Sequence, residues 1–382
     1  MPGPSARNSA ARFLRKLSHG TPGSRGGAVE SAAAEALTAG RTDRALERAI
    51  ATIEKESGPL DAASRAELTQ LFLEDGKRAI EELKRFGVNA QLDPRQADAL
   101  EAIVEQDGSR PTLPLSMEDR IDVTDAGLGQ WESVTRKFEK QIAAVASAVG
   151  RIDLDNRHVG TGFVVDDRLI LTNRHVLQGL AEPGPGGWTF QGQPTITFDA
   201  NPTESRGRQF RIHKRVLLTG PDPIDLYDLD LSKLDFAILE CAGDGGAAFP
   251  PPLPLESDID KVAAGRPIFT IGYPAAPQRG AYEADVLNRL FHYRYGVKRF
   301  SPGEIDRGTG NAADQTGPTV FTHDATTLGG HSGSCVVDLG NDGRLVVGLH
   351  FAGIPGSANY AHSNARLRPA LAGLTLTWKN WI

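Results

Sequence analysis

The sequence predicts a mainly β fold preceded by an α-helical N-terminal region. Between residues 41 and 108, apolar residues recur at helical spacing. Beyond Gly150 the chain becomes rich in glycine, proline and β-branched residues, with apolar runs of strand length. Because 382 residues exceed the usual size of one domain, we expect more than one folded unit.

The first 40 residues carry several basic side chains and no acidic residue before Glu30. They lack the uninterrupted apolar segment of a secretory signal, and no segment of the chain reaches membrane-spanning length. We therefore expect residues 1–40 to form a disordered tail. An organelle transit peptide or a basic docking arm is the alternative interpretation.

Residues 41–108 predict three helices. The first carries Leu46, Ile50 and Ile53 on one face, the second ends at Gly87, and the third follows Pro94. They hold no cluster of histidines, cysteines or paired acids, so we expect no chemistry there. Binding of a protein partner, inhibition of the rest of the chain and packing support all remain open as roles.

Turn-forming and charged residues over 109–128 predict a linker. Residues 129–382 then form the β-rich domain, which the chain enters through a helix that ends near Gly150.

Hydrophobic residues make up 40% of the chain and charged residues 24%, which is typical of a soluble globular protein. The net charge of -6 favours neither nucleic acid nor an anionic membrane as a partner. Two cysteines, Cys241 and Cys335, are too few for a disulfide framework, so we expect a reducing compartment, the cytoplasm.

Two titratable residues stand out in the β-rich part. His175 falls at the end of a predicted strand in GTGFVVDDRLILTNRHVL, and Asp235 lies inside the apolar run Leu234 to Leu239. A buried carboxylate is costly unless it is hydrogen-bonded, and His175 is the natural partner. The other nearby acids lie in a loop-like stretch where they can face water: Asp225, Asp228 and Asp230.

Ser332 lies in the glycine-rich segment TTLGGHSGSCVV, which runs into a strand. A serine nucleophile needs a base within hydrogen-bond reach and N–H donors for the oxyanion, and the glycines allow the N–H groups of Gly330 and Ser332 to converge. Alone, this segment is an ordinary turn; together with His175 and Asp235 it predicts nucleophilic catalysis. The order His, Asp, Ser differs from the order of an α/β-hydrolase, and Ser334 occupies the last glycine position of its G-x-S-x-G elbow.

The segments TNRHV, LDFAIL and GGHSGS resemble the histidine, aspartate and serine motifs of the trypsin-like serine peptidase family, in the bacterial-type branch that includes glutamyl endopeptidases. The resemblance spans about Val145 to Trp378 and implies a double β-barrel, with a first barrel at about 150–258 and a second at about 259–382. It implies a serine endopeptidase that acts on polypeptide substrates through an acyl-enzyme, without metal or cofactor. A catalytically silent protease fold acting as an interaction module is the alternative, against which the intact triad argues.

The same resemblance implies substrate-binding residues. Thr327 and His350 match the residues that bind an acidic P1 side chain in glutamyl endopeptidases, and Phe351 and Gly353 fall on a strand that lines the cleft. Acidic P1 preference and a small or unknown P1 side chain both remain open. His331 stands where many animal members have an aspartate, so their activation through an N-terminal ion pair is not available to this chain.

Overall fold

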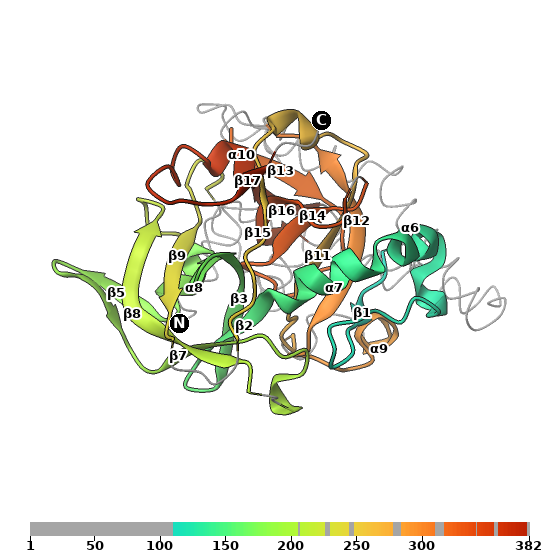
Figure 1. Ribbon diagram of the computed structural model, residues 1–382, viewed down its shortest axis with the longest axis horizontal. Coiled ribbons are helices and arrows are strands. Elements are labelled where there is room, and N and C mark those ends of the chain that lie inside the picture. The colour runs from blue at the N-terminus through green and yellow to red at the C-terminus, as the bar shows by residue number, and fades with distance from the viewer. Residues whose placement is uncertain are drawn as a thin grey trace, which may run out of the picture.

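The computed structural model describes residues 110–204, 207–225, 230–243, 248–277, 284–309, 317–340, 342–354 and 358–379. The predicted tail at 1–40 and the predicted helices at 41–108 lie outside these residues. The described part is mainly β and consists of two six-stranded barrels, with short helices between the strands (Figure 1). The prediction of a mainly β double barrel is therefore confirmed.

The first barrel is a closed ring of antiparallel strands in the order β2-β3-β4-β9-β8-β7. Its strands are β2 (Val149–Leu154), β3 (Arg157–Asp166), β4 (Leu169–Thr172), β7 (Pro194–Thr197), β8 (Gln209–Thr219) and β9 (Ala237–Cys241). The apolar runs that predicted β3 and β4 pack into the barrel core: Phe163, Val164, Ile170 and Leu171 are fully buried. A separate hairpin, β5 (Ala181–Gly184) with β6 (Gly187–Phe190), extends from this barrel.

The second barrel has the strand order β14-β11-β12-β13-β16-β15, and pairing of β14 with β15 closes it. Its strands are β11 (Pro267–Gly272), β12 (Arg299–Arg307), β13 (Val320–His323), β14 (Cys335–Asp338), β15 (Val346–Ile354) and β16 (Ala358–Ser363). Two short strands, β10 (Leu255–Glu256) and β17 (Trp378–Lys379), pair in parallel beyond β15. β10 therefore joins the sheet of the second barrel, although its residues precede position 258.

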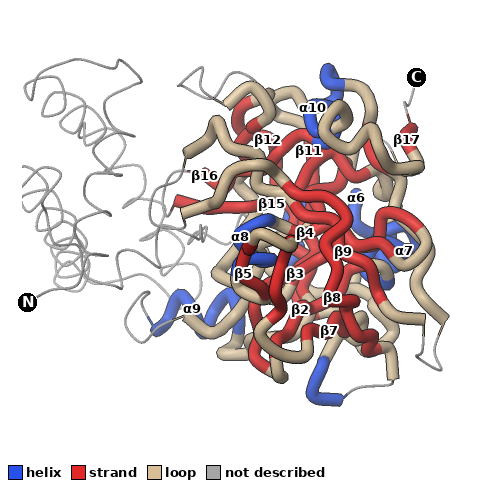
Figure 2. The backbone as a smooth tube through the Cα atoms, turned by 90° about the vertical axis from the view of Figure 1, so that its left-hand side faces the viewer, coloured by secondary structure: helices blue, strands red, loops and turns tan. Residues whose placement is uncertain are grey.

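Helices occupy the connections. They are the 3₁₀ helices η3 (Ala126–Trp131), η4 (Pro202–Glu204) and η5 (Ile259–Lys261) and the α-helices α6 (Glu132–Lys137), α7 (Glu139–Ser147), α8 (Arg174–Gln178), α9 (Ala284–Phe291) and α10 (Asn364–Leu367). α7 buries Ile142, Val145 and Ala146 and leads directly into β2 (Figure 1). α8 lies where the strands of the two barrels meet (Figure 2).

Residues 110–120, which we call the N-terminal strap, pack against the second barrel. β1 (Leu113–Pro114) pairs with β12, and the Arg110 guanidinium bonds the Asp324 carboxylate at 2.6 Å. The buried Asp119 bonds Lys298 Nζ at 2.6 Å and Arg208 Nη1 at 2.8 Å. The segment that the sequence predicts as a linker is thus attached to the barrels by a strand pairing and by ion pairs.

Within the described residues, no helix is long and apolar enough to cross a bilayer.

Candidate active site

His175 and Asp235 both lie just outside the strands in which the sequence placed them. β4 ends at Thr172, and His175 is the second residue of α8; β9 begins at Ala237, two residues after Asp235. The reason for the second displacement is that side chains, not a neighbouring strand, bond the main chain of Asp235. Asn173 Nδ2 donates to Asp235 O at 3.0 Å, and the Asp235 N–H donates to His362 Nε2 at 3.1 Å.

The carboxylate of Asp235 forms hydrogen bonds with His175 through both of its oxygens. Oδ2 lies 2.6 Å from His175 Nδ1, and Oδ1 accepts the His175 backbone N–H at 3.0 Å. Burial alone would raise the pKa of Asp235, but the interaction with His175 and these hydrogen bonds outweigh it and lower the pKa. An ionised carboxylate can only accept, so Nδ1 of His175 carries the proton and Nε2 is the basic nitrogen.

Ser332 lies in the turn between β13 and β14 of the second barrel, and this turn is attached to β3 of the first barrel. Thr161 N donates to Ser332 O at 2.8 Å, and Thr161 Oγ1 donates to Gly330 O at 2.7 Å. Gly333 has φ 89°, and a Cβ there would collide with the carbonyl oxygen of Thr161. Only glycine fits so close an approach of the two backbones.

The turn of Ser332 and the helix of His175 meet at Gly160. An ideal Cβ on Gly160 would lie 2.7 Å from Val176 Cγ2 and 3.1 Å from Ser332 O. Val176 follows His175 in α8, so the segments that carry the predicted base and the predicted nucleophile pack against the same residue of β3. The structure thus brings the three predicted catalytic segments to one junction between the barrels.

The backbone of the turn leaves two N–H groups available. Gly329 O accepts the N–H of Ala275 at 2.6 Å, and because a trans peptide holds its C=O and N–H antiparallel, the Gly330 N–H points away from Ala275. The N–H groups of His331 and Gly333 donate to Leu328 O and His350 O, at 3.1 and 3.0 Å. Within the described part of the chain, the N–H groups of Gly330 and Ser332 have no such acceptor.

His331 is completely buried and stabilises the same turn. Its Nδ1 accepts the Leu328 N–H at 3.2 Å, while its own N–H donates back to Leu328 O. Burial lowers the pKa of His331 to about 3, so the ring is neutral at physiological pH and Nδ1 is free to accept. At the position where many animal members of the family have an aspartate, this chain thus has a neutral histidine that accepts a hydrogen bond from the Leu328 N–H.

Thr327 and His350 are buried in the second barrel, where each has its own partner. Thr327 Oγ1 donates to Asn359 Oδ1 at 2.6 Å, and His350 Nδ1 lies 3.3 Å from His323 Nε2. Burial holds the pKa of His350 well below its usual range, so the imidazole is neutral. Phe351 follows His350 in β15, and Gly353 pairs with Asn359 of β16.

Sequence reasoning missed the side chains that hold the backbone of the site: Asn173, Thr161 and His362. Asn173 is the second residue of the TNRHV segment that contains His175, and this position alone could have suggested a role in the site. His362 directly follows the NYA segment. It lies 127 residues from Asp235, so no sequence pattern connects the two residues. The described residues contain no group of three or more His, Cys, Asp or Glu side chains suited to a metal ion.

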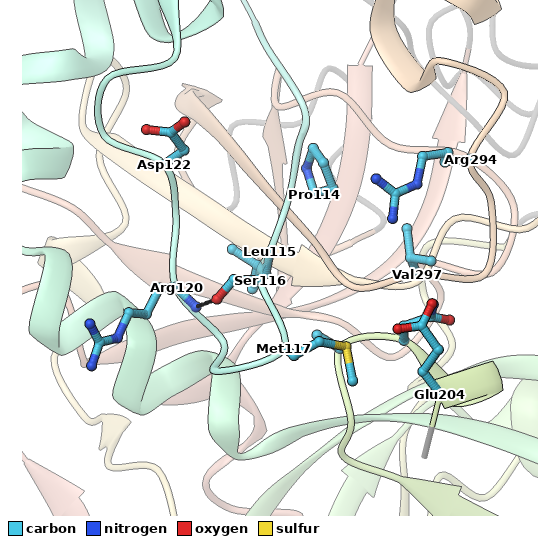
Figure 3. Close-up of a pocket in the computed structure, with 11 residues that line it drawn as sticks. Pro114, Leu115, Ser116, Met117, Arg120, Asp122, Glu204, Arg294 and Val297 are labelled. Carbon is cyan, nitrogen blue, oxygen red and sulfur yellow. Dashed lines mark hydrogen bonds between the residues drawn. The ribbon is translucent and has the colours of Figure 1, made fainter. Parts of the chain in front are cut away.

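A pocket of about 340 Å³ lies elsewhere on the molecule, between the N-terminal strap, η4 with Glu204 and the loop that carries Arg294 (Figure 3). Met117 and Glu204 reach it from opposite sides, and the Arg120 N–H bonds Ser116 Oγ at its edge. None of the predicted catalytic or substrate-binding residues lines it.

The two barrels, the His175–Asp235 pair and a glycine-rich serine turn that packs at Gly160 beside the helix of His175 define a trypsin-like protein. Residues 160–349 match the model of the trypsin-like peptidase domain. The chain is 32% identical over 364 residues to a probable serine protease of Lysobacter enzymogenes, covering 90% of this chain and 91% of the relative. The chain belongs to the trypsin-like serine protease family, and it is a serine endopeptidase.

Solved structures of the Rv3671c protease of M. tuberculosis are more distantly similar. The inactive form is 22% identical, with a TM-score of 0.38 over 61% of this chain and 92% of that one. The active form is 21% identical, with a TM-score of 0.38 over 62% and 84% of the two chains.

Proposed function

We propose that the enzyme cleaves peptide bonds with Ser332 as nucleophile, His175 as general base and Asp235 as the acid that orients the base. The observation that carries this proposal is the pair of hydrogen bonds from His175 to Asp235, with Nδ1 2.6 Å from Oδ2 and the backbone N–H 3.0 Å from Oδ1. It fixes the tautomer in which His175 Nε2 can take a proton. The attachment of the serine turn to Thr161 supports the assignment of Ser332 as the group that loses this proton.

In this mechanism His175 Nε2 removes the Ser332 hydroxyl proton while Oγ attacks the substrate carbonyl carbon. The Gly330 and Ser332 N–H groups stabilise the oxyanion. The imidazolium then gives its proton to the leaving amine, which leaves an acyl-enzyme on Ser332. Water, deprotonated by His175, hydrolyses this ester and restores the serine.

Replacement of the nucleophile tests the proposal. We expect Ser332→Ala to abolish cleavage, and a fluorophosphonate probe to label the wild type and not the variant. Ser334→Ala is the matched control, because within the described residues the Ser334 Oγ has no hydrogen-bond partner. If purified Ser332→Ala protein cleaved peptides and was labelled by the probe at the wild-type level, the assignment of the nucleophile would be contradicted.

We further propose a preference for an acidic P1 side chain. The supporting feature is a pair of neutral imidazoles. In the tautomer in which His323 Nε2–H donates to His350 Nδ1, the Nε2–H of His350 is left to donate to a carboxylate. Against it, the Thr327 hydroxyl already donates to Asn359. That contact favours the second candidate, a small P1 side chain that leaves the Thr327–Asn359 bond in place.

Matched peptides with Glu, Gln or Ala at P1 separate the two candidates. Acidic preference predicts faster cleavage after Glu than after Gln, and loss of the difference in His350→Ala but not in the exposed control His213→Ala. Because the pKa of His350 is far below 6.5, the Glu-to-Gln ratio of kcat/KM should stay constant between pH 6 and 8 as far as this ring is concerned. Equal rates for Glu and Gln with faster cleavage after Ala would support a small P1 instead.

We also propose a reducing compartment, the cytoplasm, as the site of action. Cys241 and Cys335 are free, buried thiols, and burial raises the pKa of each to about 12. Buried thiols of this kind behave as small hydrophobic side chains and need no oxidising environment.

A further inference from the structure

Each polar group of Asp235 has an assigned partner. The two carboxylate oxygens bond His175, and the carbonyl oxygen accepts from Asn173 Nδ2. Both of these partners flank the start of α8 in the first barrel. The remaining group, the backbone N–H, donates to Nε2 of His362, which lies on β16 of the second barrel. One of the four contacts that define the position of Asp235 therefore comes from the other barrel.

The ring of His362 is held on three sides. Its Nδ1 lies 2.9 Å from Thr319 Oγ1, and its face stacks on Phe351 with ring centroids 4.4 Å apart and an interplanar angle of 18°. His362 pairs with Val320 of β13 in the strand register, and Ser363 N donates to Thr319 O at 2.7 Å. The ring consequently has little freedom to turn its Nε2 away from Asp235.

The protonation state of His362 follows from these contacts. Burial lowers the pKa of His362 to about 4, so the ring is neutral at physiological pH. Since Nε2 accepts the Asp235 N–H, the single ring proton lies on Nδ1, where it donates to Thr319 Oγ1. The Asp235 N–H therefore selects the tautomer, and Thr319 Oγ1 satisfies it by accepting the Nδ1 proton.

We infer that His362 is a positioning residue for catalysis, which anchors the main chain of Asp235 to the second barrel and so keeps both carboxylate oxygens on His175. The inference rests on the proposed role of Asp235 as the acid of the triad. His362 does not touch the reacting atoms; it acts through Asp235. Without it, the buried Asp235 N–H loses its acceptor and the segment before β9 can shift, which weakens the grip on His175.

Two substitutions separate the hydrogen bond from the packing. His362→Phe keeps an aromatic ring against Phe351 but removes the acceptor, whereas His362→Gln places an amide oxygen near the position of Nε2. We expect His362→Phe to lower kcat about 10- to 100-fold with little change in KM, since misplacement of a catalytic group by about 1 Å costs on that order. His362→Gln should recover most of the activity. His213→Phe, at an exposed position of β8, is the control.

The pH dependence of kcat/KM distinguishes a positioning role of His362 from a role in packing, because loss of packing alone does not change it. The titratable groups that interact with the His175–Asp235 pair are Arg174 on α8, His350 on β15 and His362 on β16. A displaced carboxylate stabilises the His175 imidazolium less, so the pKa of His175 falls and the acid limb of kcat/KM moves to lower pH, by about half a unit in His362→Phe. An unchanged limb and unchanged kcat in folded His362→Phe would overturn the inference.

Thr319→Val is a second variant that tests the role of His362 if His362→Phe does not fold. Loss of Thr319 Oγ1 leaves the Nδ1–H of His362 without its acceptor, which destabilises the tautomer whose Nε2 accepts from the Asp235 N–H. A smaller fall in kcat, about 2- to 10-fold, with the same direction of the pH shift is expected; wild-type kcat and pH limb would contradict the inference. Failure of the proposed function has another signature, which is wild-type activity in Ser332→Ala or Asp235→Asn.

Discussion

The hydrogen bond from the Leu328 N–H to His331 Nδ1 fixes the residue that precedes Ser332. Asparagine carries Oδ1 where histidine carries Nδ1, so His331→Asn retains the acceptor, and His331→Leu removes it at similar volume. We expect His331→Leu to lower kcat about 10-fold, because a buried N–H without an acceptor costs about 1–3 kcal/mol and the turn can relax. His331→Asn should stay near wild-type kcat.

Steady-state kinetics together with the rate of fluorophosphonate labelling measure this effect, and the melting temperature shows whether each variant is folded. Equal kcat in folded His331→Leu and His331→Asn would mean that the bond to Leu328 does not position the turn.

The proposed catalytic residues and the residues that hold their backbone differ in how easily the sequence identifies them. Ser332 stands between glycines and Asp235 beside an apolar run, so local patterns find both. The acceptor of the Asp235 N–H is different, because His362 looks like any histidine in a strand and is marked only by what folding places next to it. Residues that hold the backbone of a site leave no local pattern, since their partners are distant in the chain.

At the scale of elements, the N-terminal strap carries an ion cluster between the barrels. Lys298 Nζ is fully buried and bonds the Asp119 carboxylate, Ala146 O and Phe198 O. Burial lowers the pKa of Lys298 to about 8, while the carboxylate of Asp119 opposes this fall. Asp119 therefore helps to keep a buried ammonium group charged.

We expect Asp119→Asn to lower the free energy of unfolding by about 3 kcal/mol, because removal of one partner leaves a buried charge uncompensated. Urea denaturation followed by tryptophan fluorescence measures the loss. Asp122→Asn, at an exposed position two residues after the strap, is the control. The double variant Asp119→Asn/Lys298→Met should regain part of the stability; an unchanged midpoint in Asp119→Asn alone would contradict the role of the ion pair.

No local pattern marks this cluster, because the turn formers of residues 109–128 predict a linker and Lys298 lies 179 residues from Asp119. The short elements also shifted: α8 replaces the expected end of a strand at His175. A five-residue helix has no periodicity from which to recognise it.

At the scale of the whole molecule, the double barrel followed from three short motifs in a diagnostic order, and the strand pattern supported it. Period-two alternation and apolar runs locate single strands such as β3 and β4, but they do not show that β14 and β15 pair to close the second barrel. Nor do they show that β10 pairs with β15 and β17. The predicted helices at 41–108 lie outside the described residues, and their role stays a prediction.

The bond between Asp235 and His362 has a consequence for the newly made chain. Its two ends are 127 residues apart, and the bond from Thr161 to Gly330 spans 169 residues. Contacts of such long range form slowly and late in folding. Under the proposed mechanism, a chain that has folded only its first barrel holds His175 and Asp235 but lacks Ser332, so it cannot form an acyl-enzyme. We therefore expect cleavage activity only after the second barrel has docked.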